Sequence, residues 1–218
     1  MIRKNNFLQL AILSALFVLG ISLEATAQMN ARAGVKGGLN ASNLYVDDVD
    51  DENARIGSHA GVYGQVAASE AVALQAELLF STRGAEDHYS SGTLQQEVKY
   101  NLNYIDLPLM VVLKAGKAVE FHLGGYGSYL VGANISYEGD LANGEDEIDR
   151  DHLKSYDLGL MGGVGVNFGQ VQFGARYNYG LVELADSDPA RIAIGDSKNS
   201  CAQLFVAFNF NSGNYQDD

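Results

Sequence analysis

The sequence predicts an all-β protein, an eight-stranded antiparallel up-and-down transmembrane β-barrel. Eight segments alternate apolar and polar residues with the period of two that is typical of strands. Their connections alternate between long and short, as expected for an up-and-down barrel with both chain ends at one rim. After the first 30 residues, no run reaches the roughly 18 apolar residues of a transmembrane helix. Strands would therefore have to cross the membrane.

The first 27 residues predict a secretory signal peptide. A basic start is followed by an apolar stretch from Leu8 to Leu23, and Ala25-Thr26-Ala27 offers a small-residue cleavage site. A membrane anchor is the alternative, but the apolar stretch is short and the cleavage site is well placed. We therefore expect residues 28–218 to form a single exported domain.

The clearest hairpin lies between Lys154 and Leu181. Gly169-Gln170 forms its two-residue turn, and Phe168 and Val171 flank the turn on one face, as the register of such a hairpin requires. The same alternation identifies the other strands. The eight predicted strands span about residues 32–41, 59–68, 72–83, 99–114, 119–133, 156–168, 171–181 and 201–210.

Acidic residues concentrate in the long connections. The stretch 43–56 contains Asp-Asp-Val-Asp-Asp-Glu, and the stretch 134–155 is also rich in Asp and Glu. With a formal net charge of −13, the chain is a poor partner for nucleic acid. These stretches lack the spacing of an EF-hand loop. We expect solvated loops, with weak cation bridging to lipopolysaccharide as a second interpretation.

Two kinds of barrel fit the alternation. A soluble lipocalin-like barrel buries its apolar face, whereas a membrane barrel turns that face to lipid. Glycine recurs on the face opposite the apolar one, which suits a crowded lumen. Aromatic residues lie near the strand ends of the apolar face, like the aromatic belts of a membrane barrel. They are Tyr177 and Tyr179 at one rim, and Phe168, Phe173 and Phe210 nearer the other.

Charged residues of both signs share the glycine-rich face. A packed lumen needs such pairing, because an unpaired buried charge costs much free energy. We predict a structural charge network in the lumen. Its members are Lys36, Glu77, Arg83, Asp106, Glu120, Asp157 and Arg176.

Five segments carry a family resemblance. They are, in order, GVKGGLNASNL, ALQAELLFSTRG, NYIDLPLMVVLKAG, SYDLGLMGGVGV and ARYNYGL. Together they resemble the PorT-like outer-membrane β-barrel family, whose members are described as porin-family or outer-membrane-protein β-barrel domain proteins. The resemblance covers about Ala33 to Phe210 and implies an eight-stranded barrel in the outer membrane of a Gram-negative bacterium. PorT itself is implicated in protein secretion, a role that does not extend to every member.

The C-terminus departs from the pattern of many such barrels. Eight residues, NSGNYQDD, follow the aromatic Phe210. The barrel-assembly machinery usually prefers an aromatic residue at the very end. Either the machinery tolerates this tail, or the last strand extends further.

The sequence does not indicate catalytic chemistry. His59 and His122 could face the lumen, whereas His88 and His152 fall in connections. His122 shares a face with Glu120, which favours a satisfied lumen pair over a catalytic one. The motifs HExxH and GxSxG and a phosphate loop are absent from the sequence. We therefore expect no enzyme activity, no cofactor and no metal.

The expected function is that of an integral outer-membrane barrel with a plugged lumen and acidic surface loops. Its role would be structural, binding or accessory to secretion. Expected partners are outer-membrane lipid and lipopolysaccharide, the barrel-assembly machinery, and a surface or secretion-system protein. Eight strands leave an interior that side chains roughly fill. A narrow solute pore and a soluble periplasmic ligand-binding barrel remain the alternatives.

Overall fold

The computed structural model describes residues 31–45, 55–91, 94–139, 144–147, 154–183 and 197–210. The predicted signal peptide and the C-terminal tail lie outside these residues, as does most of the predicted acidic connection 43–56. Within the described residues, no helix is long and apolar enough to cross a membrane.

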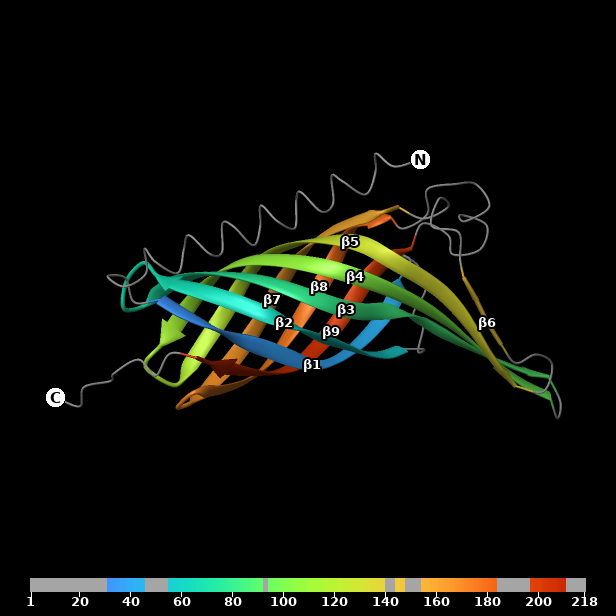
Figure 1. The fold of residues 1–218 in the computed structure, drawn as a ribbon, viewed down its shortest axis with the longest axis horizontal. Coiled ribbons are helices and arrows are strands. Elements are labelled where there is room, and N and C mark those ends of the chain that lie inside the picture. The colour runs from blue at the N-terminus through green and yellow to red at the C-terminus, as the bar shows by residue number, and fades with distance from the viewer. Residues whose placement is uncertain are drawn as a thin grey trace.

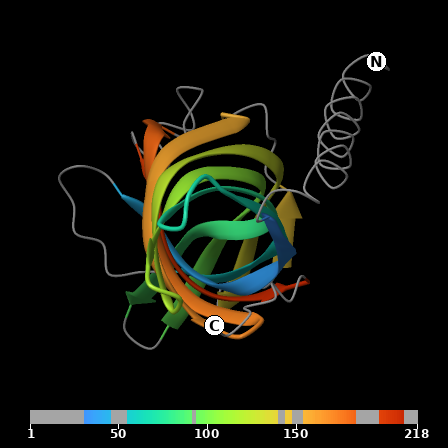
Figure 2. The ribbon, with the colours of Figure 1, turned by 90° about the vertical axis from the view of Figure 1, so that its left-hand side faces the viewer.

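Eight long antiparallel strands close into a barrel (Figures 1 and 2). They pair in the order β4-β3-β2-β1-β9-β8-β7-β5, and pairing between β4 and β5 closes the ring. This confirms the predicted all-β, eight-stranded fold. The strands are β1 (Ala31–Tyr45), β2 (Arg55–Ala67), β3 (Val72–Ser91), β4 (Leu94–Ala115), β5 (Val119–Gly139), β7 (Tyr156–Phe168), β8 (Val171–Glu183) and β9 (Lys198–Asn209).

The two ends of the barrel differ. Three short turns, at residues 68–71, 116–118 and 169–170, lie at what we call the turn end. Gly116 and Gly169 have φ values of +70° and +62°, a conformation that glycine adopts without steric cost. At the opposite end, the outer end, β3, β4 and β5 extend past the other strands (Figure 1).

The outer extension corrects two predicted connections. Residues 84–91 and 94–98 were expected to form a loop, but they continue β3 and β4 as a paired hairpin. The expected connection 134–155 contains the end of β5 and a short strand, β6 (Gly144–Glu147), which pairs with residues 134–137. The sequence of these segments is mostly polar, so the alternation signal is weak, and backbone pairing with a neighbouring strand makes them strands.

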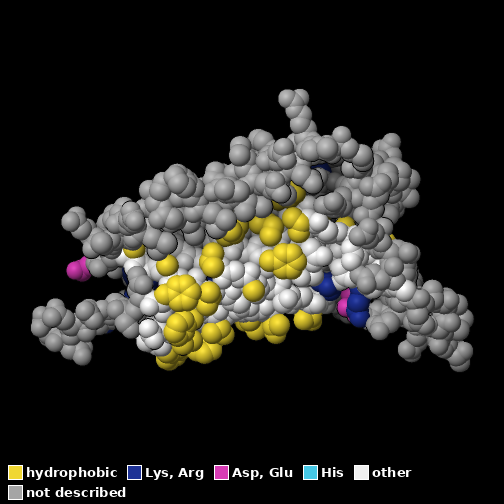
Figure 3. Space-filling view, viewed as in Figure 1, with side chains coloured by type: hydrophobic (Ala, Val, Ile, Leu, Met, Phe, Trp, Pro, Cys, Tyr) yellow, Lys and Arg dark blue, Asp and Glu magenta, His cyan; other side chains and the backbone are white. Residues whose placement is uncertain are grey.

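The wall has two chemically opposite faces. Large apolar side chains point outward, including Leu39, Leu160 and Leu204, which are 59%, 58% and 64% exposed. Residues one position away along each strand are buried and mostly polar. Figure 3 shows hydrophobic side chains along the barrel wall, with the charged groups on this face lying toward its ends. This arrangement is the reverse of a soluble protein.

Exposed aromatic residues other than Phe80 lie in two bands on the outer face. Tyr129, Tyr156, Tyr177 and Tyr179 lie toward the outer end, and Phe121, Phe168, Phe173, Phe208 and Phe210 lie toward the turn end. Amphipathic tyrosine rings suit the boundary between apolar and polar surroundings. The bands contain all five aromatic residues that the sequence placed there.

Glycine lets side chains pack across the lumen. A Cβ atom at Gly163 would lie 2.6 Å from the carbonyl oxygen of Ala175, and one at Gly174 would collide with the ring of Phe205. Gly162, on the outer face, is different, since its nearest neighbour would be Leu123 Cδ2 at 3.7 Å. Inward glycines therefore make room for lumen side chains, whereas Gly162 leaves space on the outside.

Candidate functional site in the barrel lumen

All seven residues of the predicted charge network point into the lumen. Each is at most 4% exposed. They come from six strands, and the period of two in each strand puts them on the inner face. The structure groups them into three clusters along the barrel axis.

The middle cluster consists of Glu77, Lys36 and Arg176. Arg176 donates two hydrogen bonds to the carboxylate of Glu77, Nη1 to Oε2 and Nη2 to Oε1, both at 2.8 Å. Lys36 Nζ donates to Oε1 at 3.0 Å, and Gln75 Nε2 donates to the same oxygen at 2.7 Å. Lys36 Nζ also lies 3.6 Å from the ring centroid of Phe205. Two buried cations therefore share one carboxylate and one aromatic ring.

The outer cluster has the opposite composition. Arg83 Nη2 pairs with Asp106 Oδ2, and Arg83 Nη1 lies 3.4 Å from Asp157 Oδ2. Tyr126 Oη and Asn199 Nδ2 donate to the same Asp157 oxygen at 3.1 and 2.9 Å. One buried cation therefore lies between two carboxylates, of which Asp157 accepts further neutral hydrogen bonds.

The third cluster surrounds Glu120 near the turn end. Arg32 Nη1 donates to Glu120 Oε1 at 3.1 Å, and Gln172 Nε2 donates to Oε2 at 2.9 Å. His122 was expected to be a satisfied partner of Glu120. Its Nε2 instead lies 3.7 Å from Oε2, which is too long for a hydrogen bond, and its ring stacks on Phe205. The hydrogen-bonded cation at Glu120 is therefore Arg32.

A neutral layer separates the middle and outer clusters. Asn40 Oδ1 accepts from Gln203 Nε2 at 3.0 Å and lies 2.7 Å from His59 Nδ1. Asn40 Nδ2 donates to Ser81 Oγ at 3.0 Å. Ser81 stands between Glu77 and Arg83 on β3, so this layer keeps the two charged clusters apart.

Sequence reasoning missed the neutral and aromatic members of the site. Phe205, Asn199 and Tyr126 contact the charged groups, Asn40 belongs to the neutral layer, and Arg32 completes the third cluster. Strand parity alone would have found the inward members, because it marks every second residue, charged or not. Within the described residues, no group of three or more His, Cys, Asp and Glu could hold a metal ion. The side chains of His88 and His152 lie outside the description.

Comparison with known proteins identifies the family of this barrel. Residues 26–186 match the family described as the outer membrane protein beta-barrel domain. The chain belongs to this family. The match ends before β9, which completes the barrel by pairing with β1 and β8. The protein is thus an outer-membrane β-barrel. Its apolar wall faces lipid, which excludes the alternative of a soluble lipocalin-like barrel.

Comparison with solved structures gives matches to outer-membrane proteins at low sequence identity. Ail, the attachment invasion locus protein of Yersinia pestis, solved with the heparin analogue sucrose octasulfate, is 12% identical with a TM-score of 0.46, covering 84% of this chain and all of Ail. Neisserial surface protein A is 13% identical with a TM-score of 0.48, covering 83% of this chain and 97% of that protein. Comparison with curated protein sequences gives no match.

Proposed function

We propose that this protein is a non-conducting outer-membrane anchor, whose lumen is closed by side chains and whose outer end presents a surface to partners. The observation that carries the proposal is the paired hydrogen bond between Arg176 and Glu77. Arg176 lies on β8 and Glu77 on β3, which are four strands apart in either direction around the ring. A direct contact between opposite walls supports a lumen that side chains close at that level.

Conductance in planar bilayers tests this proposal. The wild-type barrel is expected to give no steady current, because the cross-lumen pair and its neighbours fill the bore. Arg176→Ala removes the crossing side chain but leaves the Lys36–Glu77 pair, and it is expected to raise the current. Tyr177→Ala, one residue away on the outer face, is the matched control and is expected to stay silent. A steady wild-type current would favour the narrow solute pore.

The orientation of the barrel belongs to the same proposal. The turn end faces the periplasm, and the outer end, with the acidic connections, faces the cell surface. An epitope tag inserted after Asp50 is expected to bind antibody on intact cells, whereas a tag after Glu70 is expected to need permeabilised cells. The reverse labelling would contradict this orientation.

The role we propose is structural, binding or accessory to secretion, without catalysis, as the PorT-like resemblance suggests. Lipopolysaccharide, the barrel-assembly machinery and a surface or secretion-system protein are the proposed partners. A deletion strain should be compared with its parent for detergent sensitivity and for the profile of exported proteins. An unchanged profile of exported proteins would contradict a role in secretion. Unchanged detergent sensitivity would contradict a structural role in the envelope.

A further inference from the structure

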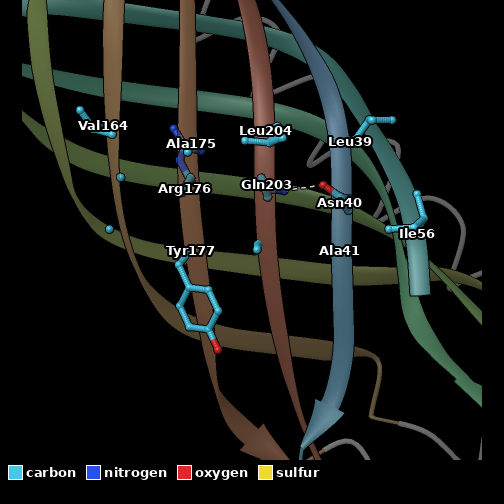
Figure 4. A pocket seen from close by; sticks show the side chains of 13 residues that line it. Leu39, Asn40, Ala41, Ile56, Val164, Ala175, Arg176, Tyr177, Gln203 and Leu204 are labelled. Atoms are coloured by element: carbon cyan, nitrogen blue, oxygen red, sulfur yellow. Dashed lines mark hydrogen bonds between the residues drawn. The ribbon is translucent and has the colours of Figure 1, made fainter. Parts of the chain in front are cut away.

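The lipid-facing wall is not uniformly smooth. A depression of about 520 Å³ lies on its outer face, within the range of roughly 300–1,000 Å³ that ligand pockets span. It crosses β7, β8, β9, β1 and the start of β2 (Figure 4). Its floor is the neighbouring pair Ala41 and Ala202, and two further small residues, Ala175 on β8 and Gly162 on β7, also line it.

Strand register explains the shape of this depression. Ala202 pairs with Ala41, and this row is bordered by Tyr177 on β8 and by Ile56 on β2. The next row toward the turn end holds Leu204 and Leu39, which project from the wall. Large side chains therefore enclose the Ala41–Ala202 pair on three sides.

The fourth side opens toward the outer end. The next row there contains Ser200, whose hydroxyl donates to the carbonyl oxygen of Asn43 at 3.3 Å. Lys198 follows on the same face of β9, and Glu183 lies opposite it in the register. The open side thus leads from an apolar floor to polar residues that include both signs of charge.

We propose that this depression holds one acyl chain of an outer-leaflet lipid, whose headgroup lies near Ser200 and Lys198. The surrounding medium is hydrocarbon, and the open side leads to the polar boundary. The outward-pointing side chains of the lining are apolar or aromatic, whereas its polar members, Asn40, Arg176 and Gln203, are buried on the lumen side. A second copy of the barrel is a poor occupant, because a symmetric pair would place concave surface against concave surface. Because the polar side offers both a cation, Lys198, and an anion, Glu183, the site recognises the acyl chain of the lipid and not the charge of its headgroup. The outer-leaflet assignment rests on the orientation proposed above.

Native mass spectrometry of the full exported chain in detergent tests the site. The probes are palmitoyl-oleoyl phosphatidylglycerol and phosphatidylethanolamine with the same chains. Ala202→Phe places a ring on the floor and is expected to reduce the one-lipid population about tenfold, equivalent to about 1.4 kcal/mol. Ala76→Phe makes the same change at an exposed outward position on β3 and is expected to bind lipid like the wild type. Ala41→Leu is a milder second variant in case Ala202→Phe does not fold.

Each outcome separates the explanations. Equal binding by Ala202→Phe and Ala76→Phe would overturn the site, as would a wild-type barrel that retains no lipid. If the wild type forms dimers and Ala202→Phe does not, the occupant of the depression is a second copy of the barrel and not a lipid. A tenfold preference for either headgroup would overturn recognition by the chain alone. A heat shift on gels verifies that each variant is folded, so these failures concern the depression and leave the membrane anchor intact. Reversed tag labelling would instead reject only the outer-leaflet assignment.

Discussion

The middle and outer clusters bury charge in opposite ways. Glu77 is the shared partner of two cations in the middle cluster, whereas Arg83 is the shared partner of two carboxylates in the outer cluster. Taken alone, each cluster carries one uncompensated charge, and the two charges have opposite sign. In each cluster, loss of the shared partner should destabilise the barrel most, because it leaves two like charges buried together.

The largest effect is expected from Glu77→Gln. This change leaves Lys36 and Arg176 buried without a carboxylate, and a guanidinium cannot lose its proton to escape. We expect the free energy of unfolding to fall by about 3–5 kcal/mol. Urea unfolding of the refolded barrel in detergent measures it. Glu70→Gln, at an exposed turn, is the control and should change stability by less than about 0.5 kcal/mol. A similar small change in both variants would contradict the role of Glu77.

Arg83→Met makes the corresponding change in the outer cluster. Two carboxylates remain close together, but carboxylates, unlike a guanidinium, can take up a proton. The loss at neutral pH is expected near the lower end of about 3–5 kcal/mol. Urea unfolding in detergent beside Glu77→Gln measures the loss. A loss larger than that of Glu77→Gln would contradict this ranking of the two clusters.

Leu78→Arg tests the other face of the same strand. Leu78 is adjacent to Glu77 and points outward, so an arginine there would enter lipid. Near the bilayer midplane the expected cost is about 2–4 kcal/mol in a lipid bilayer. Leu78→Ala is the control, since it shortens the side chain without adding charge and should cost much less. Equal losses in both variants would mean that Leu78 is packed against protein rather than lipid.

The smallest effect is expected from Lys36→Met. The paired hydrogen bonds between Arg176 and Glu77 survive, and the middle cluster becomes neutral. The lost contacts with Glu77 and Phe205 are offset by removal of an excess buried charge, so stability should change by no more than about 1 kcal/mol. Urea unfolding beside Glu77→Gln checks it. A loss as large as that of Glu77→Gln would show that the shared carboxylate is not special.

Much of the fold and part of the site could be predicted from parity. Leu78 outward and Glu77 inward follow from a period of two, and the same rule put all seven charges in the lumen. The outer parts of β3, β4 and β5 were not predicted, because their sequence is mostly polar and backbone pairing with a neighbour makes them strands. The sequence did not predict the pairing of Arg32 with Glu120 either, since these residues are 88 positions apart and meet only when the ring closes.

The sequence established which side chains share the apolar face of the wall and which share the polar face, because that choice is local to each strand. It also determined that the strands form a single antiparallel ring, through the alternation of short and long connections. The closed ring was needed to show that Arg176 reaches Glu77 from the opposite wall, and that Ala41 and Ala202 lie side by side at the depression. Both depend on strand order and register, which bring together residues whose spacing along the chain carries no signal.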